Sequence, residues 1–139
     1  MLRVRIARSE ECVMYELTVE MSFSAAHSIA GHRGRCANLH GHNYRAVITV
    51  AGERLNEQGM LIDFGDLKAI CAEIITPLDH SYLNDLPAFG EVNPTAEAIA
   101  GHIYDAVEIA LSRAHKGVRL SHVRVCESET SYATYRGET

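Results

Sequence analysis

The stretch VMYELTVEMSFSAAH, residues 13–27, alternates apolar and polar side chains over most of its length. Leu17 and Phe23 belong to the apolar set, and Glu16 and Glu20 to the polar set. Period-two alternation is typical of a strand with one buried and one solvated face. We therefore predict a half-buried strand of about a dozen residues that begins near Val13. The last residue of the stretch, a histidine, has the parity of the apolar set, provided that no bulge interrupts the strand.

A second stretch, CANLHGHNY (residues 36–44), places a thiol shortly before a pair of histidines. Because alternate residues of a strand point to the same face, His40 and His42 would converge on one point. His27, at the end of the first strand, offers a third nitrogen. Three histidines suit a catalytic zinc ion, which keeps one coordination position open for water or substrate. The spacing leaves two roles for Cys36, a fourth zinc ligand or a reactive thiol beside the metal.

The rest of the chain alternates between helical and strand patterns. A helix over about Phe64–Ile75 has Asp63 as its N-cap, and a second helix begins with either Asn93 or Thr95 as its cap. The other predicted elements are a strand at 40–51, the body of the second helix up to about residue 115, and strands at about 118–127 and 132–136. This order, ββααββ, predicts an α+β fold with a four-stranded antiparallel sheet and both helices on one face.

The composition indicates an ordinary globular protein with one domain over residues 1–139. Of these residues 47% are hydrophobic and 22% are charged, and the formal net charge is −5. The acidic balance argues against nucleic acid as a partner, and no apolar run approaches the ~20 residues of a membrane span. The four cysteines show no disulfide spacing, so we expect reduced thiols and a cytoplasmic location. Residues 1–11 show no clear period, and we interpret them as a leader.

Further ionisable residues are candidates for chemistry. Asp79 and His80 are adjacent in a predicted loop, and an aspartate can orient an imidazole for proton transfer, although many such pairs only cap turns. Glu127 ends an apolar row on a predicted strand, which by itself is typical of an ordinary strand-end acid. Arg33 and Arg35, in a glycine-punctuated loop, are either solvated or bind substrate phosphates.

The order of these motifs resembles that of the 6-pyruvoyl-tetrahydropterin synthase superfamily. The matching segments are His27, Cys36–Tyr44, Leu78–His80, Asn93–Glu97 and Val125–Glu127. The short spacing from Cys36 to the histidine pair looks like that of the 6-carboxy-5,6,7,8-tetrahydropterin synthase branch, which belongs to queuosine biosynthesis. The resemblance covers about residues 12–138 and implies the tunnelling fold, in which sheets of several subunits form a barrel.

The resemblance also implies a role for each candidate residue. It makes His27, His40 and His42 the ligands of Zn²⁺, Cys36 a catalytic base, and Asp79 with His80 a proton-transfer pair. Glu127 would anchor the pterin ring through two parallel hydrogen bonds. The family commonly has a threonine after this glutamate, whereas Ser128 follows here, so Glu129 is kept as a second candidate.

The implied reaction is that of a carbon–carbon lyase without a redox cofactor. It converts 7,8-dihydroneopterin triphosphate into 6-carboxy-5,6,7,8-tetrahydropterin, acetaldehyde and triphosphate. Family members form homo-oligomers, usually hexamers, with active sites at subunit interfaces, and we expect the same here.

Three alternatives remain. The sister 6-pyruvoyl-tetrahydropterin synthase eliminates triphosphate, and the short Cys36 spacing argues against it. An aldolase-like cleavage of an unphosphorylated pterin is performed by relatives that commonly carry a glutamate near the position of Cys36. A zinc-stabilised scaffold or pterin-binding protein would have no need of the ligands, thiol, Asp–His pair and anchor together.

Overall fold

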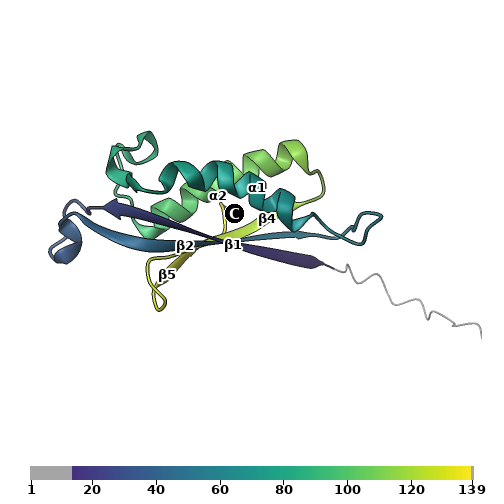
Figure 1. The fold of residues 1–139 in the computed structure, drawn as a ribbon, viewed down its shortest axis with the longest axis horizontal. Coiled ribbons are helices and arrows are strands. Elements are labelled where there is room, and N and C mark those ends of the chain that lie inside the picture. The colour runs from purple at the N-terminus through teal and green to yellow at the C-terminus, as the bar shows by residue number, and fades with distance from the viewer. Residues whose placement is uncertain (1–13, 139) are drawn as a thin grey trace, which may run out of the picture.

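The computed structural model describes residues 14–138 as a twisted sheet covered by two α-helices (Figure 1). The strands are β1 (Tyr15–His27), β2 (His40–Gly52), β3 (Ser81–Tyr82), β4 (Arg119–Cys126) and β5 (Tyr132–Tyr135). The helices are α1 (Phe64–Ile75) and α2 (Ala96–Ala114), and short 3-10 turns include η1 (Arg35–Ala37) and η3 (Leu83–Asp85). The predicted leader, and Val13 as the start of the first strand, lie outside the described residues.

The sheet differs from the predicted one. It has five strands in the order β3-β1-β2-β4-β5, and β3 runs parallel to β1, so the sheet is mixed. The prediction of a four-stranded, wholly antiparallel sheet was therefore wrong at one edge. Strand β3 is only two residues long, and a pair of residues carries no periodicity from which a strand can be predicted. It forms because Ser81 and Tyr82 lie beside Ala25 and Ala26 at the open edge of β1.

The hairpin formed by β1 and β2 contains the two longest strands of the sheet. Its antiparallel register runs without a break from Tyr15 opposite Gly52 to His27 opposite His40. Since no bulge interrupts β1, the face of every side chain follows from its parity, and His27 shares a face with buried Val19 and Phe23. Ile48, the residue of β2 directly opposite Val19, is fully buried on the same face.

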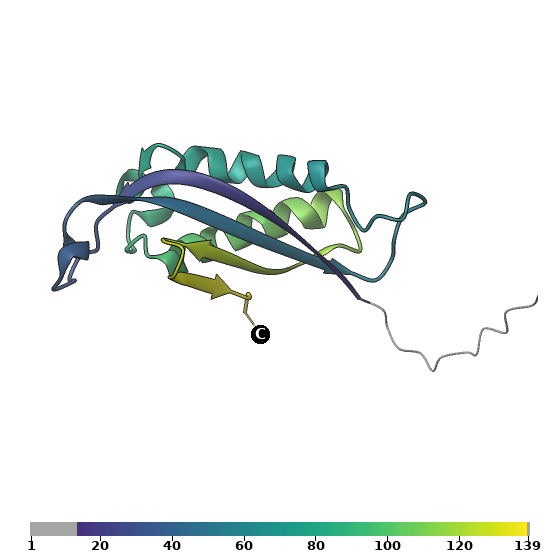
Figure 2. The same cartoon turned by 60° about the horizontal axis from the view of Figure 1, so that its bottom comes forward.

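Both helices pack on this apolar face, and none lies on the opposite face among residues 14–138 (Figures 1 and 2). The prediction that the helices share one face is confirmed. Leu67 and Cys71 of α1 and Ile103 and Val107 of α2 are fully buried between the helices and the sheet. Burial raises the pKa of the Cys71 thiol to about 11, as expected of a small core residue.

The helix boundaries follow the capping signals. Asp63 caps α1 by accepting hydrogen bonds from the N–H groups of Gly65 and Asp66. Thr95, rather than Asn93, caps α2 by accepting a hydrogen bond from the N–H of Ala98. In the part of the chain described here, neither helix is both long and apolar enough to span a membrane.

Candidate active site

Three histidines meet at the end of the β1–β2 hairpin. His27 and His40 are directly opposed across the strands, and His42 lies opposite Ala25 two pairs further along. All three side chains point to the helix-covered face, because they share the parity of the buried positions. Their ring centroids are 4.5–5.0 Å apart, and one donor atom from each lies within 4.8 Å of the other two. The structure therefore brings together the histidines predicted to bind a metal.

The hydrogen bonds of these rings determine where their lone pairs point. Nδ1 of His27 lies 2.7 Å from the carbonyl oxygen of Pro94, and Nδ1 of His40 lies 2.7 Å from that of Asn38. A carbonyl oxygen only accepts, so in both neutral rings the proton sits on Nδ1 and the lone pair on Nε2. The two Nε2 atoms face each other at 2.9 Å.

Two lone pairs at this distance repel each other unless a cation or a proton lies near both. His42, the third ring, also directs a nitrogen with a free lone pair at this point, because its Nε2 is buried and has no hydrogen-bond partner within residues 14–138. Burial lowers the pKa of His42, which favours the neutral, metal-binding form. The donor set thus fits a divalent metal ion that accepts imidazole ligands, and carbonyl groups orient two of its ligands as is usual for such sites.

Two supporting groups were not predicted from the sequence. The Tyr44 hydroxyl lies 3.2 Å from His27 Nδ1, and the ring of Tyr44 stacks on Phe23 with centroids 4.9 Å apart. Burial, with a smaller effect of Glu127, raises the pKa of the Tyr44 phenol, so it stays protonated. Tyr44 was predicted to lie on this face because it is two residues after His42 in the same strand, but its contact with His27 was not predicted. The second group is the carbonyl of Pro94, and no sequence pattern indicated that it would be a partner of His27.

A cavity of ≈ 390 Å³ lies beside the cluster, between the loop after β1, the start of α2 and the β4–β5 turn. Its walls include His27, Cys36 and Glu127. The carboxylate of Glu127 lies 4.0 Å from His27 Nε2 and is about one-third exposed. Cys36 is half-buried on η1 and does not belong to the group of converging metal donors among the described residues. This placement favours a thiol that faces a ligand over a fourth metal ligand.

The Asp79–His80 pair lies elsewhere, at the β3 edge of the sheet. Asp79 Oδ2 is 3.0 Å from His80 Nδ1, and Asp79 Oδ1 accepts a hydrogen bond from the N–H of Ser24 at 2.8 Å. The Ser24 contact, and then the His80 contact, lower the pKa of the Asp79 carboxyl. The His80 side chain is 83% exposed, and its backbone has a positive φ of 56°.

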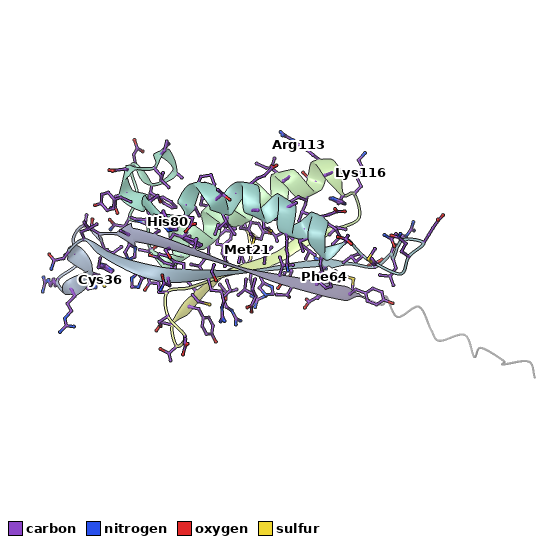
Figure 3. The ribbon with its side chains drawn as sticks, in the orientation of Figure 1. Met21, Cys36, Phe64, His80, Arg113 and Lys116 are labelled. Atoms are coloured by element: carbon purple, nitrogen blue, oxygen red, sulfur yellow. The ribbon has the colours of Figure 1, made fainter. Side chains whose placement is uncertain are left out.

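No hydrogen bond or ion pair connects this pair to the histidine cluster within residues 14–138. Figure 3 labels Cys36 and His80 toward the same end of the molecule, with Cys36 in the loop that joins β1 to β2. Of the remaining candidates, Arg33, Arg35 and Glu129 are exposed. The single chain therefore brings the three histidines, Cys36 and Glu127 together, whereas the His80 side chain faces solvent.

The fold and site define a class of protein, an α+β domain with a three-histidine metal site next to a small cavity that holds a thiol and a carboxylate. Residues 16–138 match the family described as 6-pyruvoyl tetrahydropterin synthase, and the chain belongs to this family. The predicted resemblance is thereby confirmed, as is the prediction that the chain is an enzyme of this family.

Named relatives and a solved structure agree with this assignment. The chain is 42% identical to 6-carboxy-5,6,7,8-tetrahydropterin synthase of Synechocystis sp., over 88% of this chain and 93% of the relative. It is 36% identical to human 6-pyruvoyl tetrahydrobiopterin synthase, over 88% of this chain and 92% of the relative. The structure of Caenorhabditis elegans 6-pyruvoyl tetrahydropterin synthase superposes with a TM-score of 0.81 at 26% identity, covering 91% of this chain and 97% of that one.

Proposed function

We propose that this protein converts 7,8-dihydroneopterin triphosphate and water into 6-carboxy-5,6,7,8-tetrahydropterin, acetaldehyde and triphosphate, as a step of queuosine biosynthesis. The observation that carries the proposal is the cavity in which Cys36 and Glu127 lie beside His27. Relatives from Synechocystis sp. and Bacillus subtilis, 42% and 38% identical to this chain, are named 6-carboxy-5,6,7,8-tetrahydropterin synthase.

The proposed metal is Zn²⁺, held by His27, His40 and His42. When bound, it supplies Lewis-acid chemistry at the hydroxyl groups of the substrate side chain. The chain contributes the orientation of the ligands: the carbonyls of Pro94 and Asn38 hold two rings with Nε2 directed at the site.

Cys36 is the proposed base at this centre. Its place on the wall of the cavity that includes His27 and Glu127 supports this role, in which the thiolate would accept a proton from a side-chain carbon of a bound pterin. A cysteine that reacts in this way acts as a thiolate, and neighbouring cations favour that form.

Glu127 is the proposed anchor of the pterin ring. A carboxylate accepts two parallel hydrogen bonds from the amino group and adjacent N–H of the ring. Glu127 is supported over Glu129 because it is half-buried and lies 4.0 Å from His27 Nε2, whereas Glu129 is exposed in the β4–β5 turn. Anchoring the ring there would hold the substrate side chain against Cys36, which is a contribution of positioning.

The remaining proton transfers are assigned to His80, oriented by Asp79. Because no hydrogen bond or ion pair joins this pair to the histidine cluster within the described residues, we assign it to a site completed by a second copy. Exposed apolar side chains such as Leu39, Val92 and Tyr132, each more than half exposed, offer surfaces for such an assembly. A homo-oligomer, a hexamer in the proposed form, would then carry active sites at its subunit interfaces.

The second candidate is 6-pyruvoyl-tetrahydropterin synthase activity, favoured by the 36% identity to the human enzyme of that name. The experiment that separates the two is to incubate zinc-loaded protein with 7,8-dihydroneopterin triphosphate and identify the products by mass spectrometry. Carboxy-tetrahydropterin with acetaldehyde supports the proposal, and pyruvoyl-tetrahydropterin supports the second candidate. A protein that binds zinc but turns over neither would instead be a scaffold or pterin-binding protein.

A further inference from the structure

Two asparagine side chains form hydrogen bonds to the backbone of residues 28–30, which follow β1, as a neighbouring strand would. Asn84 accepts a hydrogen bond from the N–H of Ser28 through Oδ1 and donates one to the carbonyl of Ser28 through Nδ2, both at 2.9 Å. Asn93 makes the same pair of bonds to Ala30, again both at 2.9 Å. A carboxamide carries the donor and acceptor of a peptide group, so each asparagine satisfies both backbone groups of one residue.

These contacts continue the ladder between β1 and β3. The parallel pairing of the strands ends with Ala26 beside Tyr82, and two residues further along each chain Ser28 meets Asn84. Alternate residues of an extended chain direct their N–H and C=O groups to the same edge, which explains why residues 28 and 30 both face asparagines. Ser28 also contacts the Tyr82 hydroxyl through its own hydroxyl at 2.8 Å.

The opposite edge of the same segment holds the loop that carries the thiol. Ile29 donates a hydrogen bond from its N–H to the carbonyl of Cys36 at 2.7 Å. Because Ile29 lies between the two clamped residues, the backbone position of Cys36 is set by a short segment that the asparagines fix.

The two asparagines also lie next to the residues that fix the ring of His27, a proposed metal ligand. His27 directly precedes the clamped segment, and Asn93 directly precedes Pro94, whose carbonyl accepts the hydrogen bond of His27 Nδ1. The side chain of Asn93 can bond to Ala30 because Thr95, and not Asn93, caps α2. One short region thus determines the positions of both the ring of His27 and the loop of Cys36.

We propose that Asn84 and Asn93 are positioning residues that hold Cys36 in place relative to His27. The proposal rests on the proposed function only in taking Cys36 as the base and His27 as a metal ligand. Neither asparagine lines the cavity that Cys36 shares with His27, so their effect is indirect. Since a displacement of about 1 Å can cost up to about a hundredfold in rate, loss of either clamp should lower kcat more than it changes KM.

The variants Asn84→Asp and Asn93→Asp test the proposal in the full-length protein. An aspartate has the size of asparagine but, when ionised, cannot donate and sets an oxygen against the carbonyl of Ser28 or Ala30. Asn56→Asp is the matched control. Among the described residues, the Asn56 side chain uses only Oδ1, which accepts hydrogen bonds from the N–H groups of Gln58 and Met60, so an aspartate preserves both contacts.

Hydrogen exchange read by mass spectrometry is the primary measurement. In both clamp variants, exchange over residues 28–38 should rise about tenfold at pH 7 while α1 and β4 keep the wild-type rates, because only the local segment is released. The difference should shrink as the pH falls and the new carboxyl is protonated, since a protonated aspartate donates again. Alkylation of Cys36 by iodoacetamide should become several-fold faster, and kcat for the zinc-loaded enzyme should fall about tenfold with KM nearly unchanged.

Unchanged exchange and alkylation over residues 28–38 would overturn the proposal. So would a rise that spreads equally over α1 and β4, because it would mean that the asparagines only stabilise the fold. Exchange and alkylation need no turnover. They therefore decide the proposal even if the product assay rejects the proposed reaction.

Discussion

The histidine cluster and the Asp79–His80 pair contrast in how completely one chain builds them. The cluster is formed by facing residues of one hairpin, His27 is 1% exposed, and backbone carbonyls hold two of its rings. The Asp79–His80 pair lies at the β3 edge, where the imidazole is 83% exposed and Asp79 is its charged neighbour. A metal site needs ligands fixed within a few tenths of an ångström, whereas a residue that transfers protons can be supplied from another surface.

Metal binding and proton transfer, the two parts of the proposed chemistry, therefore depend on different levels of structure, the first on one hairpin and the second on the proposed assembly of chains. The register of a single hairpin brings the three histidines together, so an isolated chain already contains the candidate metal site. In the proposed function, Asp79 and His80 act in a site that a second copy completes at the open face or edge of the sheet. Experiments that remove one half at a time can therefore show whether the division is real.

The largest effect is expected from removal of a metal ligand. His42→Ala should lower zinc content and reduce turnover by about a thousandfold or more, because Lewis-acid stabilisation is worth several kcal/mol. Zinc per chain measured by atomic absorption, together with kcat, checks this. His122→Ala is the control, since this histidine of β4 hydrogen-bonds to neighbouring Ser121 and belongs to no metal group among the described residues. Full zinc occupancy in His42→Ala would break the assignment of the cluster.

A mixing experiment addresses the division between chains. Cys36→Ala and His80→Ala should each lose about 10²- to 10⁴-fold in kcat while retaining zinc, since each removes a proton-transfer group and no ligand. If one site draws these residues from two copies, equal amounts unfolded and refolded together should recover about a quarter of the wild-type activity. A mixture that stays as inactive as its components would place both residues in one chain's site.

Chelation should destabilise the hairpin end of the molecule. A metal bound only by the folded chain stabilises it by about 3–4 kcal/mol when present at 100 to 1,000 times its Kd, so EDTA should lower the Tm by several degrees. Differential scanning calorimetry with and without zinc measures the shift. The same treatment of His42→Ala should produce almost no shift, and an equal shift in that variant would point to a different zinc site.

The smallest effect is expected at the exposed pair, through pH. The pKa of Asp79 is lowered in the folded chain, so its carboxylate stabilises the fold above the ordinary carboxyl range, and this contribution is lost as pH falls through the lowered value. Asp79→Asn should therefore be slightly less stable than wild type at neutral pH and equal to it in strong acid. Thermal melts between pH 7 and pH 2 test this, and a gap that widens in acid would contradict the sign.

Much of this architecture could be predicted from local patterns. Residues 64–75 were predicted as a helix with the limits that the structure shows, because Asp63 marks its start and Pro77 its end. The parity of His27 placed it on the face of His40 and His42, and the unbroken register made that inference correct. Strand β3 was missed because two residues have no period, and its partner is more than fifty residues away in the sequence.

The sequence by itself determined the strand and helix patterns, the residue types of the metal site and the motif order by which the family was inferred. These depend on side-chain chemistry and on periodicities of two and 3.6 residues, which are local properties. Only the tertiary structure decided that the carbonyls of Asn38 and Pro94 contact two of the histidines. It also decided that Asn84 and Asn93 bond to the backbone of Ser28 and Ala30, and that His80 faces solvent. Those contacts join backbone groups to residues distant in the chain, and backbone groups are the same at every position, so no sequence pattern records them.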